Sequence, residues 1–175
     1  WVESIRHVLA TLSPALSADR MVKEYVERLY IPAAESERAT SASSYAPARE
    51  LSGWKAKLSE AWPDVHVVHV ESGGVDVVPQ IGDSLHVRAL VDLGSLSPDD
   101  VKVEIVYGHA RNGDSLEGIH RTRLTLDSAD AGVPAAFSGT VELERPGSFG
   151  YNVRVVPSHR LLANPAELGL IAVAR

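Results

Sequence analysis

The sequence predicts an α+β protein in which an N-terminal helical segment, residues 1–62, precedes an antiparallel immunoglobulin-like β-sandwich, residues 63–175. Before residue 63, apolar residues recur at three- and four-residue spacing, which is the period of an amphipathic helix. After it, they alternate with polar residues in short runs separated by turn-forming residues, which is typical of strands. The helical crossovers that a parallel sheet requires are not found between these runs.

Two helices are expected within residues 1–30. In the first, apolar residues follow a helical period, and Pro14 should end it because proline lacks an amide proton and restricts the residue before it. Ser17 is a good N-cap for the second helix, and Asp19 suits the positive end of its dipole. Pro32 should close this segment. The apolar positions are Val2, Ile5, Val8, Leu9 and Leu12, then Met21, Val22, Tyr25, Val26 and Leu29.

A third helix is expected from about Ala48 to Ala61, stopped by Pro63. Residues 33–44 offer little to bury, so they are predicted to be a linker or a frayed helix. Leu51, Trp54, Leu58 and Trp62 share one face of the third helix. Core or interdomain packing is the expected role of all three tryptophans, Trp1 included.

About seven short strands with one apolar face each are expected in the second segment. The alternating runs lie at residues 65–70, 85–93, 101–107, 121–126, 137–144, 151–155 and 168–172. Tyr107 and Tyr151 fall on apolar positions and are predicted to be buried; Tyr151 is either a core residue or a tyrosine corner. Turns are predicted at Ser72–Gly74, Ile81–Asp83, Ser97–Asp100, Asn112–Asp114 and Arg145–Gly147.

Composition excludes several classes of function. The net charge is -6 and no stretch is strongly basic, so no nucleic-acid partner is expected. The absence of cysteine excludes disulfides, thiolate metal sites and cysteine nucleophiles, and it fits a cytoplasmic protein. No apolar run approaches the ~20 residues of a membrane span, so no membrane partner is expected.

No catalytic, cofactor-binding or metal-binding residue is predicted. Neither a serine-nucleophile elbow nor a phosphate-binding glycine loop occurs. His66 and His69 are three apart in a strand, so they are expected on opposite faces, unable to hold one ion together. His109, His120 and His159 lie near loops and could meet only through long-range folding.

Asp99 and Asp100 form a carboxylate pair after Ser97-Pro98, and turn chemistry explains them. Calcium ligation is the alternative, but it would need partners that the sequence does not identify. No exposed aromatic stripe indicates a carbohydrate-binding module.

Trp1, followed by Ser17-Ala18-Asp19-Arg20-Met21-Val22-Lys23-Glu24-Tyr25, resembles the C-terminal helices of α-glucan (glycogen or maltodextrin) phosphorylases. Met21 and Val22 replace a Thr-Ile pair of the animal and yeast enzymes, which favours the bacterial branch. Residues 150–159 are similar to the closing strand of that branch.

The resemblance implies a parent glycosyltransferase that releases glucose 1-phosphate from α-1,4-glucans with orthophosphate and pyridoxal phosphate. Its catalytic and cofactor residues would lie upstream, so Lys23, Lys55, Lys57 and Lys102 receive no cofactor role, and this chain alone should be inactive. Expected partners are the rest of the phosphorylase chain, α-1,4-glucan and a second copy of the chain.

Three interpretations therefore remain open. The sandwich of a phosphorylase could dock on the catalytic body, assemble an oligomer or tether glucan. The chain could instead be a non-enzymatic glycan- or protein-binding β-sandwich module, or the tail of another glycan-processing enzyme.

Overall fold

The computed structural model describes residues 1–75, 80–111, 115–130, 132–143 and 147–174. The chain divides into two compact units, Trp1–Glu50 and Leu51–Arg175. The first is helical, and the second joins the end of a helix to two four-stranded antiparallel sheets. The predicted α+β class with a β-sandwich is confirmed.

The helices are α1 (Val2–Leu16), α2 (Ala18–Tyr25), the π-helical turn η1 (Val26–Tyr30) and α3 (Ile31–Ala61). The predicted cap is present, because the Ser17 hydroxyl accepts a hydrogen bond from the Arg20 amide at 3.3 Å. Both predicted proline stops are wrong. Pro14 lies in the last turn of α1, which ends two residues later at Leu16 and is followed by the extended Ser17. Pro32 is the second residue of α3, but the helical run does not begin there, because the π-helical turn η1 continues into α3 through Ile31.

The predicted linker, residues 33–44, is mostly helical, and the break lies at its end. Ala42 is extended, with ψ of 151°, and Ser43, Ser44 and Tyr45 are left-handed, with φ of 49°, 54° and 65°. A left-handed conformation costs a non-glycine residue roughly 1–2 kcal/mol. After this break α3 continues to Ala61, as predicted for the third helix, and a 3₁₀ turn, η2 (Trp62–Asp64), contains Pro63.

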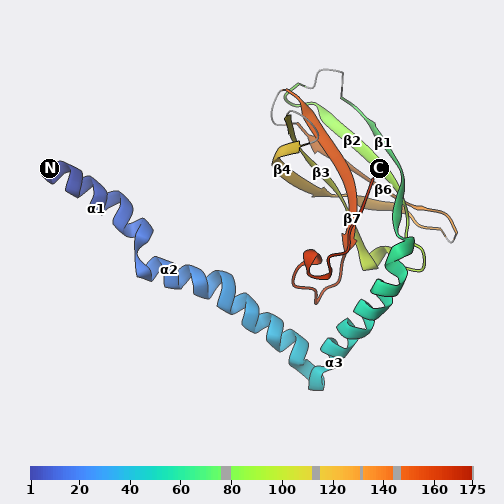
Figure 1. The fold of residues 1–175 in the computed structure, drawn as a ribbon, viewed down its shortest axis with the longest axis horizontal. Helices are drawn as coiled ribbons and strands as arrows, with labels where there is room; N and C mark the ends of the chain where they lie inside the picture. Colours follow the sequence, from blue (N-terminus) through green and yellow to red (C-terminus); the bar gives the residue numbers. More distant parts are fainter. Residues whose placement is uncertain (76–79, 112–114, 131, 144–146, 175) are drawn as a thin grey trace. The chain divides into compact units, whose positions relative to one another are not determined.

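The two sheets have the strand order of an immunoglobulin-like sandwich (Figure 1). One sheet has the order β1-β2-β6-β5, and the other has the order β4-β3-β7-β8. The strands are β1 (His66–Gly73), β2 (Ser84–Asp92), β3 (Val101–Arg111), β4 (Ser115–Arg123), β5 (Thr125–Ser128), β6 (Ala135–Glu142), β7 (Phe149–Pro157) and β8 (Ala172–Val173).

The described residues form eight strands where about seven were expected. The run at 121–126 is two strands, β4 and β5, which belong to different sheets and meet at Leu124. Leu124 is buried, and its amide donates to the Val103 carbonyl at 2.9 Å, so it crosses between the sheets as part of the core. Sequence patterning missed most of β4 because this edge strand is exposed along nearly its whole length and has no apolar period.

The last predicted strand is mostly a different structure. Asn164 caps a 3₁₀ turn, η4 (Pro165–Leu168), and only the two residues of β8 pair with β7. The predicted turns at Asn112–Asp114 and Arg145–Pro146 lie outside the described residues.

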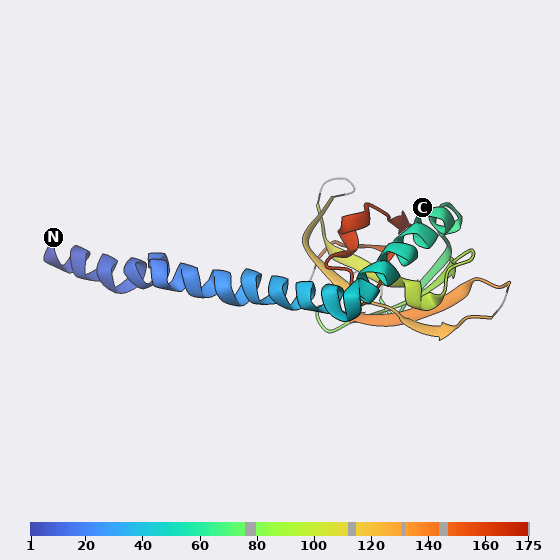
Figure 2. The same ribbon diagram turned by 90° about the horizontal axis from the view of Figure 1, so that it is seen from below.

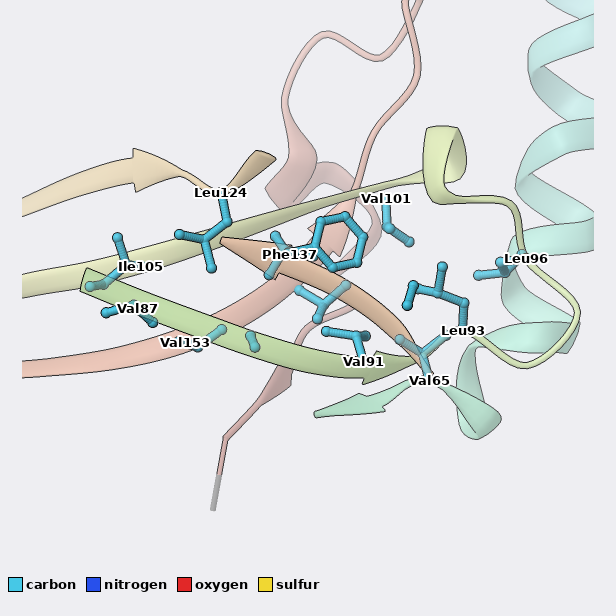
Figure 3. Packing of buried hydrophobic residues seen from close by; sticks show 14 of the residues in the cluster. Val65, Val87, Val91, Leu93, Leu96, Val101, Ile105, Leu124, Phe137 and Val153 are labelled. Atoms are coloured by element: carbon cyan, nitrogen blue, oxygen red, sulfur yellow. The ribbon is translucent and has the colours of Figure 1, made fainter. Parts of the chain in front are cut away.

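The core fills the space between the sheets and extends to the end of α3. Inward-facing side chains such as Val91, Ile105, Phe137 and Val153 meet there (Figure 3). Leu58 of α3 is 0% exposed and joins the same cluster, together with Ala61 and Trp62. The unit that begins at Leu51 therefore encloses a hydrophobic core of its own.

Candidate functional site

The helices before α3 carry an apolar stripe without a partner among the described residues. No residue of α1, α2 or η1 is buried. Leu9 is 59% exposed and Trp1 is 93% exposed, so the packing role expected for Trp1 is not met within this chain. Exposed apolar side chains at helical spacing are typical of a helix surface that packs against another segment. The stripe comprises Ile5, Val8, Leu9, Leu12, Met21, Val22, Tyr25, Val26 and Leu29.

Asp100 joins the end of α3 to the sandwich. Its carboxylate accepts a hydrogen bond from the Trp54 indole nitrogen at 2.7 Å and from the Lys57 ammonium at 3.0 Å. It also accepts from the Ser97 amide at 2.9 Å, and the Ser97 hydroxyl accepts from the Asp99 amide, which completes a capping box. The turn prediction for Asp99 and Asp100 is confirmed, and the Asp100 carboxylate is occupied by protein donors.

The pKa of Asp100 reflects this environment. Burial raises it, but the hydrogen bonds from Ser97, Lys57 and Trp54 together hold the pKa below its ordinary value. The folded state therefore favours the charged carboxylate.

Two further contacts hold the same end of α3. The rings of Trp54 and His159 lie 4.7 Å apart at an interplanar angle of 34°. Lys55 forms an ion pair with Glu167 of η4, and Figure 2 shows this part of α3 beside η4. The Asp100 joint, defined as Trp54, Lys55, Lys57, Asp100 and Glu167, thus fixes the helix end to two separate loops.

Glu104 is the buried charged residue among those described. It lies on the outer face of the β3 sheet, where both nitrogens of one edge of Arg154, Nε and Nη2, donate to it at 2.9 and 2.7 Å. Lys102 adds a contact of 2.6 Å. Burial raises the pKa of Glu104, but Lys102 and Arg154 together keep the pKa below its ordinary value. This cluster pins β3 to β7 and leaves no free carboxylate for catalysis.

A ring-lined cleft opens where the apolar core ends. Ile105 is fully buried, and the next inward position of β3 is Tyr107, which is half-buried and not buried as predicted. Its ring stacks on His120 of β4 at 5.6 Å and tilts against Phe149 of β7 at 5.8 Å. The cavity of this cleft has a volume of about 70 Å³. Its principal side chains are Tyr107, His109, Glu117, His120 and Phe149.

Strand pairing explains why these rings meet. Tyr107 lies opposite both His120 and Tyr151, and His109 lies opposite both Glu117 and Phe149. Directly opposite residues in antiparallel strands project to the same face. A bulge between the two levels, with Gly118 at φ 62°, brings Glu117 and His120 to one face although they are three apart. Tyr151 packs against the core, in keeping with the core interpretation, but it is half-buried and not buried as predicted.

A second bulge corrects the prediction for His66 and His69. The register of β1 on β2 shifts between Val67 and His69, so Val68 is the extra residue. His66 and His69 therefore both lie on the outer, exposed face, whereas Val67 and Val70 face inward. The strict alternation assumed from sequence is wrong here. The extra residue of the bulge shifts the alternation by one position, so residues three apart lie on the same face.

The histidines do not assemble a recognisable metal site in the described ranges. His69 contacts Glu71 at 3.6 Å, and Nδ1 of His86 pairs with the Thr140 hydroxyl at 2.9 Å. No group of three His, Cys, Asp or Glu side chains with metal-binding geometry occurs in the part of the chain that the structure describes. None of the helices described is both long and apolar enough to cross a membrane.

Comparison with known proteins gives a consistent result. The glycogen phosphorylase C-terminal domain family matches residues 62–175. Glycogen phosphorylases of Mycobacterium bovis and Mycobacterium tuberculosis are each 40% identical over 174 residues, 99% of this chain. Maltodextrin phosphorylase of Thermococcus litoralis is 30% identical over 175 residues, 98% of this chain. The chain spans 20% of the length of each of these relatives. No solved structure matches it.

Proposed function

This chain belongs to the glycogen phosphorylase C-terminal domain family, and we propose that it is the non-catalytic C-terminal region of an α-glucan phosphorylase. In this proposal, residues 1–62 contain the last helices of the catalytic region and a connecting helix, and residues 63–175 are an appended β-sandwich. The whole cytoplasmic enzyme transfers the terminal glucose of an α-1,4-glucan to orthophosphate.

The observation that carries the proposal is the unpartnered apolar stripe. Burying one leucine or valine side chain is worth about 1.5–3 kcal/mol, so leaving many of them in water is unfavourable. The relatives are about five times as long as this chain, of which they match 98–99%. We infer that the remainder of the same polypeptide covers the stripe, and that these helices brace the catalytic body.

Pyridoxal phosphate does not fit the lysines of this chain. A Schiff-base lysine needs a free amine in a cavity, but all four lysines contact carboxylates: Glu27, Glu167, Asp100 and Glu104. This supports a cofactor site in the upstream part of the enzyme, and no catalytic step is assigned to the residues described here.

The Asp100 joint supports a docking role for the sandwich. Because Trp54, Leu58 and Trp62 bind the end of α3 to the sandwich core, this helix end and the sandwich behave as one body. Because the sandwich is held rigidly on the end of α3, the two keep one relative position. A module held in this way suits docking or subunit assembly.

The test uses the complete phosphorylase polypeptide and a matched pair of substitutions in α1. Leu9→Asp places a charge in the stripe, and Ala10→Asp places the same charge about 100° around the helix, off the stripe. We expect Leu9→Asp to lower the melting temperature and the rate of glucose 1-phosphate release, with Ala10→Asp close to wild type. Equal behaviour of the two variants would overturn the proposed docking of the stripe.

The 175-residue chain alone provides the second measurement. We expect it to release no glucose 1-phosphate from maltoheptaose and to form no stoichiometric Schiff base with pyridoxal phosphate. A Schiff-base absorbance abolished by substitution of one lysine would contradict the non-catalytic assignment.

A further inference from the structure

We propose that the ring-lined cleft formed by Tyr107, His109, Glu117, His120 and Phe149 is a glycan-binding site that accepts one pyranose unit of an oligosaccharide. The cleft lies on the inner face of the β3 sheet, beyond the last fully buried residue of that strand, Ile105.

The rings supply the surface on which a sugar stacks. One face of a pyranose presents C–H groups, which are weakly positive and apolar, and the face of an aromatic ring is negative. Tyr107 is flanked by His120 at 5.6 Å and Phe149 at 5.8 Å, so three rings from three neighbouring strands form a continuous patch. His120 is exposed and Tyr107 and Phe149 are half-buried, so the patch is open to a ligand.

The polar groups beside the patch can bind the hydroxyls of a ligand. Glu117 is an exposed carboxylate that accepts hydrogen bonds from hydroxyls, while the imidazoles of His109 and His120 can donate or accept. Glu117 is paired with Arg111, which orients its carboxylate.

A simple cap on the core would look different. Side chains that only close the end of a sandwich are expected to be apolar and buried, as Leu143 is, at 3% exposed. Here His109, Glu117 and His120 are exposed beside the half-buried rings of Tyr107 and Phe149. Apolar walls with a few convergent polar groups are the usual form of a small-ligand site.

Another hollow of the sandwich lacks this combination. A groove on the outer face of the β2 sheet is lined by Glu71, His86, Arg88, Ser138 and Thr140, with no tyrosine, phenylalanine or tryptophan. His86 there is held by Thr140, and Arg88 lies 4.0 Å from Glu71, so these polar groups contact one another. The ring-lined cleft is the better candidate.

The class of ligand follows from the cleft, but its identity as an α-1,4-glucan rests on the proposed function. A single sugar-binding cleft of this size binds weakly. Attached to an enzyme that acts on the same polymer, it raises the local concentration of chain ends without new contacts at the active site.

The experiment titrates the 175-residue chain, which is free of competing upstream sites. Maltoheptaose, cellohexaose and xylohexaose are added in turn, with binding followed by two-dimensional NMR, and glycogen is tested by affinity electrophoresis. His120→Ala removes one exposed ring of the patch, and His66→Ala is the matched control, an exposed histidine on the outer face of the other sheet. Phe149→Ala is the second ring variant, accepted only if its amide spectrum stays dispersed.

We expect maltoheptaose to shift amide resonances of β3, β4 and β7, with at least fivefold weaker binding in His120→Ala and unchanged binding in His66→Ala. Binding of another oligosaccharide at the same resonances would support the cleft and count against the α-glucan assignment. Absence of binding by all the oligosaccharides and glycogen, or equal binding by His120→Ala and His66→Ala, would overturn the cleft. Neither of these results bears on the docking of the stripe, which the Leu9 and Ala10 variants test separately.

Discussion

Asp100→Ala is the substitution that most directly tests the connection between α3 and the sandwich. It removes the carboxylate that accepts hydrogen bonds from Trp54, Lys57 and the Ser97 amide. The backbone bond from the Ser158 amide to the Asp100 carbonyl is retained, so the turn itself has support.

The loss can be worked out contact by contact. The Trp54 indole is part-buried, and leaving its N–H without an acceptor costs about 1–3 kcal/mol. Loss of one half of the capping box costs about 1 kcal/mol. Lys57 is half-exposed, so its ion pair contributes no more than about 0.5 kcal/mol. The free energy of unfolding should therefore fall by about 2–4 kcal/mol.

Urea unfolding followed by tryptophan fluorescence measures this change. With a slope of about 2 kcal/mol per molar urea, the midpoint should decrease by about 1–2 M. Asp99→Ala is the control, because Asp99 is the exposed neighbour in the same turn, and its loss should change the stability by less than about 0.5 kcal/mol. Equal midpoints for the two variants would refute the assignment of Asp100 as the residue that holds the helix end.

Three further predictions concern the same unit. Because both Asp100 and Glu104 have a pKa below the ordinary values of 3.8 and 4.5, their stabilising effect is complete above those values and is lost as pH falls through the lowered pKa. The urea midpoint should therefore drop as pH falls below about 4.5, less steeply in Asp100→Asn, and a parallel pH profile in that variant would contradict this. Glu104→Gln should lower the free energy of unfolding by about 2 kcal/mol, because the contacts with Arg154 and Lys102 are lost. Glu71→Gln, at an exposed ion pair, should change the free energy of unfolding by less than about 0.5 kcal/mol. Equal urea midpoints for these two variants would contradict the prediction. Leu58→Ala should lower the free energy of unfolding by about 2–5 kcal/mol and broaden the NMR resonances of the sandwich, because the end of α3 is part of the core. An unchanged spectrum and an unchanged urea midpoint would instead indicate that the sandwich folds independently from residue 63 onward.

The sequence predicted elements well where burial is periodic. β2, β3, β6 and β7 contribute alternating side chains to the core, so their period of two is visible in the residues themselves. β4 was largely missed because an edge strand with few buried side chains leaves no such pattern. The helix ends were misplaced because neither proline stops its helix: Pro14 lies in the last turn of α1, and Pro32 lies where the π-helical turn η1 continues into α3.

The sites depended on features that one-dimensional patterns do not contain. His109 and His120 lie in one cleft because β3 pairs with β4 across a bulge at Gly118, and no local signal specifies that register. For the same reason the sequence placed His66 and His69 on opposite faces of β1, because the bulge at Val68 leaves no local signal. Trp54 and Asp100 are 46 residues apart, and although the turn at Asp100 was predictable, its indole and ammonium partners were not.

The break at residues 42–45 separates two parts of the helical segment, the apolar stripe and the Asp100 joint. The apolar stripe ends before it, at Leu29, and the Asp100 joint begins after it, at Trp54. A sandwich that serves docking needs this connection to hold one geometry, since any variation there would be passed on to the docked module. A sandwich that captures glycan instead needs a connection long and flexible enough to bring the bound glycan to the active site. The effective concentration of a tethered ligand depends on how closely the linker length matches the distance between the two sites. Three consecutive left-handed non-glycine residues are costly to maintain unless contacts compensate. The two proposed roles, docking and glycan capture, therefore make opposite demands on the residues between Ser41 and Ala46.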